Sequence, residues 1–127
     1  MSTSAQYAST PKCGVVQVSV ANTNRDGTGT IATIFTAGAS GSRIDRVTVE
    51  AVAATTAGMV RLFIHDGVNS RLYNEIPVPA VTPSGTTPAF RYQLPIEGGL
   101  ALPTGYSLRA STNNAETFNV IAQGGDF

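Results

Sequence analysis

Apolar and polar side chains alternate with a period of two along most of the chain, and clusters of Gly, Pro and Asn interrupt the alternation. Successive side chains of a β-strand point to opposite faces, so this pattern predicts strands. No window of about 11 residues carries the apolar period that marks an amphipathic α-helix. The sequence therefore predicts an all-β protein.

Eight strands are expected between the turn signals. They cover residues 14–21, 28–37, 43–53, 58–65, 71–78, 90–94, 106–111 and 118–122. The segment 58–65 is apolar on both faces, which predicts a central strand that is buried on both sides. Ile44 is out of phase with the apolar residues that follow it, and one extra residue near Asp45 and Arg46 would restore the phase. We therefore expect a β-bulge there.

Three connections carry specific expectations. The segment Pro77–Pro88 holds four prolines, which cannot donate to a β-ladder, so it is expected to be a surface loop. The segment GGLALPTG, residues 98–105, is predicted to be a connector because of its glycines and proline. The last two strands are separated by a short turn, NNAE, and are expected to pair as a hairpin.

Short strands without helices between them fit an antiparallel double-sheet sandwich, and the eight-stranded jelly roll is the most economical version. An immunoglobulin-like sandwich is the alternative, although the chain lacks the Trp and the cysteine pair that mark true immunoglobulin domains. Residues 1–11 are rich in Ser, Thr and Ala and are expected to form a flexible N-terminal arm. Residues 12–127 are expected to form a single β-sandwich domain.

The charge composition narrows the range of partners. Only 13% of the 127 residues are charged, about half the usual share, and eight acidic residues balance eight basic ones. Without net charge the chain has no basic field to attract nucleic acid or an anionic membrane, so neither partner is expected. Seven of the eight basic residues are Arg, which protein interfaces favour over Lys. We expect a surface covered by other protein, with a soluble monomer rich in Ser, Thr and Asn as the alternative.

Signals for export and for membrane insertion are missing from the sequence. The opening residues MSTSAQYASTPK show no basic leader followed by an apolar run, so no secretory signal is expected. No segment is apolar over the ~18 residues that a membrane-spanning helix needs. We therefore expect synthesis in a cytoplasm.

Groups able to carry catalysis are scarce. His65 is the only histidine and no GxSxG motif supplies a nucleophile, so we expect a hydrogen-bonded His at a turn. One Cys and one His do not suffice for zinc, and the surroundings of Asp26 and Asp126 match no calcium-binding loop. Cys13 is expected to be a small buried hydrophobe. The sequence thus predicts no enzyme and no catalytic, cofactor or metal site.

Two long segments resemble a known family. RIDRVTVEAVAATTAGMVRLFI (43–64) and LPTGYSLRASTNNAETFNVIAQGGDF (102–127), with the Pro-rich segment between them, are similar to small virion proteins of tailed bacteriophages. Within that group the chain looks like a capsid decoration (cement) protein, several of which are jelly rolls that sit as dimers or trimers on the outside of the head. The resemblance covers about two-thirds of the chain, from Arg43 to Phe127, and brings no functional residue with it.

The resemblance implies a non-enzymatic structural protein that lies on the capsid surface of the virion and stabilises the head shell. Its expected partners are the major capsid protein and further copies of itself, as a homotrimer or homodimer. Tyr7, Pro11 and the adjoining Lys12 are the expected contact residues of the arm, which would add backbone hydrogen bonds along an exposed sheet edge. The alternatives are a receptor- or carbohydrate-binding knob of a tail fibre or spike, a tail or neck adaptor and, as the remotest, a glycoside-cleaving enzyme.

Overall fold

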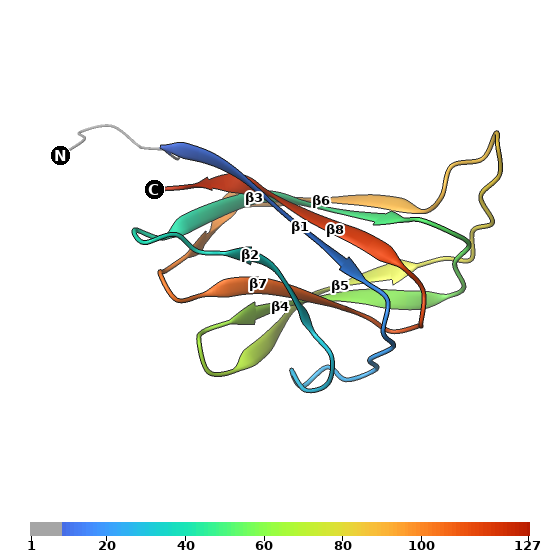
Figure 1. The fold of residues 1–127 in the computed structure, drawn as a ribbon, viewed down its shortest axis with the longest axis horizontal. Coiled ribbons are helices and arrows are strands. Elements are labelled where there is room, and N and C mark those ends of the chain that lie inside the picture. Colours follow the sequence, from blue (N-terminus) through green and yellow to red (C-terminus); the bar gives the residue numbers. More distant parts are fainter. Residues whose placement is uncertain (1–8) are drawn as a thin grey trace.

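The computed structural model describes residues 9–127 and shows two four-stranded antiparallel sheets packed face to face (Figure 1). Its strands are β1 (Thr10–Val18), β2 (Ala32–Thr36), β3 (Ser42–Ala51), β4 (Gly58–His65), β5 (Ser70–Val78), β6 (Arg91–Leu102), β7 (Ser107–Thr112) and β8 (Phe118–Asp126). No helix occurs in this range. The predicted all-β, double-sheet sandwich is confirmed.

The order of the strands is that of a long hairpin rolled over on itself. The first sheet has the order β1-β8-β3-β6 and the second sheet the order β2-β7-β4-β5. Early strands pair with late ones: β1 with β8, β2 with β7, β3 with β6 and β4 with β5. This is the jelly-roll arrangement. Among the described strands only β4 and β5 are both consecutive and adjacent, whereas immunoglobulin sheets join several consecutive pairs, so that alternative is wrong.

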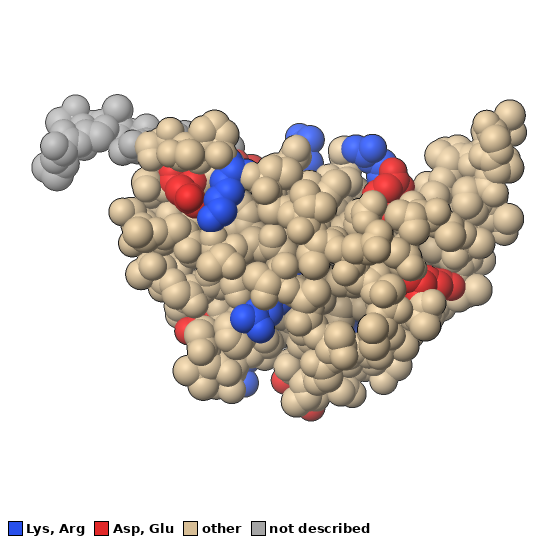
Figure 2. Space-filling view, viewed as in Figure 1, with Lys and Arg blue, Asp and Glu red and all other residues tan. Residues whose placement is uncertain are grey.

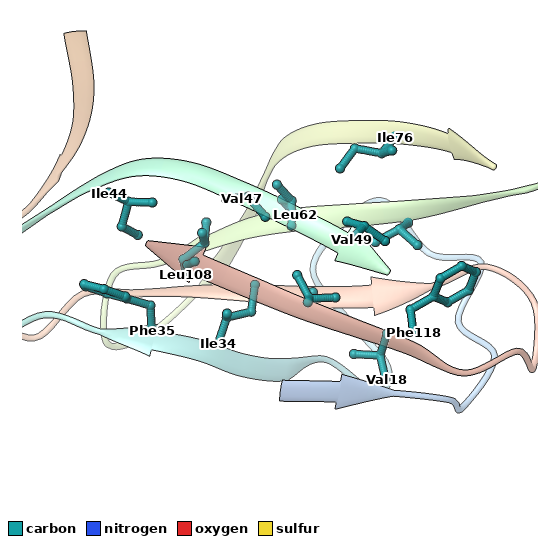
Figure 3. Packing of buried hydrophobic residues seen from close by; sticks show 14 of the residues in the cluster. Val18, Ile34, Phe35, Ile44, Val47, Val49, Leu62, Ile76, Leu108 and Phe118 are labelled. Carbon is teal, nitrogen blue, oxygen red and sulfur yellow. The ribbon is translucent and has the colours of Figure 1, made fainter. Parts of the chain in front are cut away.

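The hydrophobic core fills the space between the two sheets (Figure 3). Val47 and Val49 of β3 are fully buried, as are Leu62 of β4 and Leu108 of β7, and each occupies one of the alternate positions that point inward. Burying an aliphatic side chain of this size contributes about 1.5–3 kcal/mol to folding. β4 lies in the interior of the second sheet, and its predicted central, buried position is confirmed.

The predicted bulge near Asp45 and Arg46 is confirmed. The pairing of β3 with both of its neighbours, β6 and β8, shifts register between Ile44 and Arg46. The extra residue returns Ile44 to the inner face of the sheet, where it is fully buried.

β7 and β8 do not pair with each other, so the predicted C-terminal hairpin is wrong. β7 lies between β2 and β4 in the second sheet, whereas β8 lies between β1 and β3 in the first. The connection 113–117 therefore crosses from one sheet to the other. Alternating apolar side chains determine which face of a strand is buried, and that face is the same whichever neighbour the strand pairs with.

β6 is longer than predicted. The segment 98–105 is expected to be a connector, but β6 runs through its first half to Leu102. Gly98 and Gly99 have φ values of 75° and 78°, which glycine adopts without strain, and they lie in a bulge after which pairing with β3 resumes. Glycines are typical of turns and of bulges alike, so their presence alone does not separate the two.

β1 begins and ends earlier than predicted, because it pairs along its whole length with β8. Thr10 and Pro11, which the sequence assigns to the arm, lie in this strand. The rest of the predicted arm, residues 1–8, lies outside the described residues. Pro11 is tolerated because β1 is an edge strand, where a missing N–H donor breaks no pairing on the open side.

The predicted Pro-rich surface loop is confirmed for residues 79–88 and continues to residue 90, while Pro77 lies in the edge strand β5. Thr55 fastens the start of this loop. Its N–H donates to the carbonyl of Val81 at 2.9 Å, and its hydroxyl donates to the carbonyl of Pro79 at 2.8 Å. Figure 1 shows the rest of the loop protruding at one end of the sandwich.

Candidate functional site

The connection between β1 and β2, residues 19–31, lies over the outer face of the second sheet, and we call it the cover segment. The N–H of Asn22 donates to the carbonyl of Thr112 at 2.8 Å, and Arg61 of β4 reaches the carbonyl of Asn22 at 3.4 Å. Figure 1 shows the segment below β7 and β4, on the side away from the first sheet. Phe63 alternates with the core residue Leu62 and so faces outward, yet it is fully buried. We attribute this burial to the cover segment.

Three charged side chains fasten the cover segment to the sheet. Oε2 of Glu75, on β5, accepts hydrogen bonds from Nε of Arg25 in the cover segment at 2.7 Å and from Nε of Arg61 at 2.9 Å. The hydrogen bond from Arg25, followed by that from Arg61, holds the pKa of Glu75 below its ordinary value. Arg61 is only 3% exposed and also donates to Oδ1 of Asn113 at 3.1 Å. The buried cation is therefore paired and hydrogen-bonded, as burial of a charge requires.

The outer face of the first sheet has a different character. Its side chains alternate with core residues, and the pairing registers place them in rows that cross all four strands. We call these residues the open face. They are Gln17, Asn119, Glu50 and Arg91 in one row, Val15, Ile121, Thr48 and Gln93 in the next, and Cys13, Gln123, Arg46 and Pro95 in the third.

The open face carries three charged residues among its twelve, and two of the three offset each other. Glu50 and Arg91 lie 4.0 Å apart and offset each other, which leaves Arg46 as its one charge without an ion pair in the described chain. Val15 is 62% exposed and lies opposite Ile121 of the neighbouring strand. Figure 2 views the molecule from the side of the sandwich, where the charged side chains appear as separate spots on a largely uncharged surface. The middle row of the open face carries no charge, and depletion of charge is typical of the centre of a protein interface.

Two of the three predicted contact residues, Pro11 and Lys12, lie at the start of β1. Tyr7 lies outside the described residues, and Pro11 is exposed on the edge of the first sheet. Cys13 is exposed as well, so its predicted burial is wrong. The register explains the difference, because Cys13 pairs with Gln123 on the open face while Gly14 takes the inward position.

Lys12 is engaged within the chain. Its Nζ donates to the carbonyl of Thr36 on β2 and to Oδ1 of Asp126 at 3.2 Å, and it lies 4.7 Å from the ring centroid of Phe35. Hydrogen bonds from Ser42, the stronger influence, and from Lys12 lower the pKa of Asp126. These contacts fasten the edge strand β1 to both sheets, so the charge of Lys12 is already used inside the sandwich.

A polar pocket of about 270 Å³ opens between the cover segment, the β4–β5 turn and β7. Its charged and titratable lining consists of Asp26, His65, Arg71 and Arg109, and the remainder is mostly Gly, Ser, Thr and Asn. The pocket lies on the second sheet, on the opposite side of the sandwich from the open face.

His65 ends β4, and its Nδ1 lies 3.0 Å from Oγ of Ser70, so the predicted hydrogen-bonded His is confirmed. A serine hydrolase also needs a carboxylate that orients the imidazole. The carboxylate of Asp26 accepts hydrogen bonds from the hydroxyl and the N–H of Thr28, and these lower its pKa. The carboxylate of Asp66 accepts hydrogen bonds from backbone N–H groups of the β4–β5 turn, and these lower its pKa as well. No carboxylate among residues 9–127 accepts a hydrogen bond from His65, so the pair lacks the third member of a triad.

Metal sites require a group of ligating side chains, and membrane-spanning helices require a long apolar segment. No group of three or more His, Cys, Asp or Glu side chains able to hold a metal ion occurs among residues 9–127. The same residues contain no helix with the length and apolar character needed to cross a bilayer.

Comparison with known proteins gives a likeness in fold and none in sequence. No family model matches the chain, and no curated protein does so either. Two solved structures, each described as a pentameric capsid protein isolated from metagenomic phage sequences, are similar to it at 18% and 17% sequence identity. Each match covers 89% of this chain and spans 67% or 59% of the other, with TM-scores of 0.42 and 0.40.

Sequence reasoning missed the cover segment and the pocket. The walls of the pocket come from residues 26–31, 65–71 and Arg109, which only the sheet topology brings together. The excess of Arg over Lys was the one available signal, and it points to partners without saying which arginines remain unpaired.

Proposed function

We propose that this chain is a non-enzymatic structural protein of a bacteriophage virion, and more narrowly a decoration (cement) protein that binds the outer surface of the head. The observation that carries the proposal is the open face: a broad sheet surface whose middle row carries no charge and whose apolar residues Val15 and Ile121 lie side by side in that row. The resemblance of residues 43–127 to small virion proteins supports it.

The mechanism we propose is mechanical. A protein that binds the assembled shell, but not its separate subunits, lowers the free energy of the assembled form by mass action. Contacts that are weak individually become strong when a homotrimer or homodimer engages several capsid subunits at once. The major capsid protein and other copies of this chain are therefore the proposed partners, and residues 1–8 are proposed as an arm that contacts a neighbour.

The chemistry of the described residues favours binding over catalysis. The histidine is paired with Ser70 but has no orienting carboxylate, and the aspartates near it are occupied by their own turns. A catalytic site needs several groups that act together on one reacting atom. The location that we propose is the capsid surface, after synthesis in the host cytoplasm.

A mass-spectrometric inventory of purified phage particles tests the location. We expect hundreds of copies of the chain per particle, and we expect particles that lack it to lose their DNA at a lower temperature. A few copies per particle would place the chain in the tail, and equal heat resistance of both particles would refute a stabilising role.

A charge placed on the open face tests the surface itself. Val15→Glu introduces a carboxylate at a position that is 62% exposed, so the fold should persist while binding to shells falls by roughly tenfold or more. Val52→Glu is the matched control, because Val52 is 50% exposed but lies beyond the end of β3. Equal binding by the two variants, measured by co-sedimentation with shells, would rule out the open face as the contact.

A further inference from the structure

The polar pocket contains two arginines that form no ion pair in the described chain, although the charge of Arg71 contributes to the lowered pKa of Asp66. In the described chain four arginines form ion pairs, whereas Arg46, Arg71 and Arg109 form none. Arg46 lies on the open face, but the other two line the same pocket. The Nε of Arg109 donates to Oγ of Ser107 at 3.1 Å, which leaves the rest of its guanidinium group available. A guanidinium group carries five N–H donors in a planar fork that matches the geometry of a carboxylate.

The two nearest carboxylates are already occupied. Asp26 lines the pocket, but its Oδ1 accepts the hydroxyl of Thr28 at 2.6 Å and the N–H of the same residue at 3.1 Å. Oδ1 of Asp66 accepts the N–H groups of Val68 at 2.9 Å and Asn69 at 2.8 Å. Each aspartate stabilises its own turn, and neither lies within ion-pair distance of the pocket arginines.

The walls of the pocket are held in place by close packing. A Cβ atom built on Gly27 of the cover segment would lie 2.1 Å from the carbonyl oxygen of Ser70, so backbone meets backbone there. Gly27 has a φ of 89°, which a larger residue adopts only with strain. The hydroxyl of Ser70 is in turn hydrogen-bonded to His65. The pocket is thus formed before any ligand enters.

The size and lining of the pocket indicate what fits it. A volume of about 270 Å³ holds one side chain or one sugar ring. No Phe, Tyr or Trp lines the pocket, so it offers no aromatic platform on which a sugar could stack. The two guanidinium groups without an ion pair outnumber the single carboxylate of the lining, that of Asp26, and this excess of positive charge favours a small anion over a neutral group.

We infer that the pocket binds a single carboxylate, presented by an acidic side chain of a partner polypeptide in the particle. The inference rests on the proposed function only for the source of the ligand. It assigns Arg71 and Arg109 as binding residues and gives the second sheet a contact of its own, distinct from the open face.

The test uses the full-length chain and two short peptides. Acetyl-Gly-Glu-Gly-amide is titrated while the side-chain Nε–H resonances of the arginines are followed by NMR, and acetyl-Gly-Gln-Gly-amide is the uncharged control. We expect saturable shifts at Arg71 and Arg109 with the Glu peptide only. Arg109→Gln should weaken the binding by about tenfold, and Arg46→Gln, which removes the same charge from the open face, should leave it unchanged.

In the peptide titration, three results would overturn the inference. They are the absence of saturable shifts, equal binding of the Glu and Gln peptides, and binding that survives in both Arg109→Gln and Arg71→Gln. The exposed Arg71 provides the second variant in case the change at Arg109 disturbs β7, and thermal melting identifies any unfolded variant. Tighter binding of N-acetylneuraminic acid than of the Glu peptide would make the ligand an acidic sugar, and it would overturn the polypeptide source.

Binding to whole shells separates this inference from the proposed function. If the unaltered chain binds shells and Arg109→Gln binds them equally well, the pocket inference fails while the decoration role stands. If the unaltered chain does not bind shells but its pocket takes the Glu peptide, the decoration role fails and the carboxylate site stands.

Discussion

Both sheets consist of four antiparallel strands, but a connection of the chain covers the outer face of the second sheet and, among residues 9–127, none covers that of the first. The cover segment lies over the second sheet, where Glu75 accepts hydrogen bonds from Arg25 of the segment and from Arg61 of the sheet. Phe63 of this sheet faces outward, yet it is fully buried. On the first sheet Val15 and several glutamines of the open face remain exposed. The same β-architecture therefore yields one face that the chain largely covers with its own connection and one face that it leaves open.

This difference indicates that the apolar residues exposed on the open face do not result from incomplete folding of the chain. Burial of an aromatic side chain and a paired arginine under residues 19–31 demonstrates that a connection of this length suffices to cover a sheet. On the other sheet, the middle row of the open face carries no charge and holds adjacent branched apolar residues, which is typical of an interaction surface.

The largest expected effect is at Phe63. Phe63→Ala should lower the free energy of unfolding by about 3–5 kcal/mol, because it leaves a cavity between the sheet and the cover segment. Val15→Ala, on the open face, should change it by no more than about 0.5 kcal/mol. Denaturant unfolding of both variants measures the contrast. Similar values for the two would mean that the cover segment does not pack on the second sheet.

The next effect concerns the contact between the cover segment and the β4–β5 turn. Gly27→Ala adds a methyl group against the carbonyl of Ser70 and should cost about 1–3 kcal/mol more than Gly105→Ala. Gly105 is a matched control, because its φ of 88° is nearly that of Gly27 but its surroundings are open. Chemical denaturation of the two variants gives the difference, and equal stability would show that the contact is not tight.

A smaller effect is expected to depend on pH, since Glu75 is partly open to solvent. Its folded-state pKa lies below the ordinary 4.5, so its ionised form stabilises the fold fully above that pH and loses the effect as the pH falls through the lowered pKa. The stability difference between the unaltered chain and Glu75→Gln should therefore be constant from about pH 7 to 5 and shrink below about pH 4.5. A difference that persists at pH 2.5 would contradict the ion pair.

The smallest effect is expected at Ser111 of β7. Its hydroxyl is buried and has no hydrogen-bond partner among the described residues. Ser111→Ala removes an unsatisfied polar group without changing the shape of the site much, so stability should stay the same or rise by up to about 1 kcal/mol. Thermal melts of the variant check this, and a clear loss of stability would reveal a partner for the hydroxyl under the cover segment.

Side-chain alternation predicts much of the fold, but it does not determine which strands pair with each other. The bulge at Asp45 and the burial of β4 follow from local phase and apolar content. The predicted hairpin of β7 and β8 is wrong, and the second half of β6 is not predicted, because both features are determined by pairing between strands far apart in the sequence. The early start of β1 has the same cause, since Thr10 and Pro11 have no strand pattern of their own and are ordered by β8.

The candidate site is less predictable than the fold. Lys12 has the sequence context of a free charge at the end of an arm, but contacts with Asp126 and Phe35, far along the chain, engage it. Arg61 and Arg109 are alike in sequence, at alternate positions of apolar strands, yet one is paired with a carboxylate and the other is not. Only the distances between strands separate a structural arginine from one that is available to a ligand.

The pairing of β1 with β8 has a consequence for how the protein is made. The ribosome produces β1 first and β8 last, so an edge of the first sheet emerges with its partner still untranslated. Pairing between segments so far apart is slow, and unpaired strand edges expose nascent chains to aggregation. The first sheet closes only after β8 has left the exit tunnel, so any truncation upstream of β8 yields a chain without a complete sandwich.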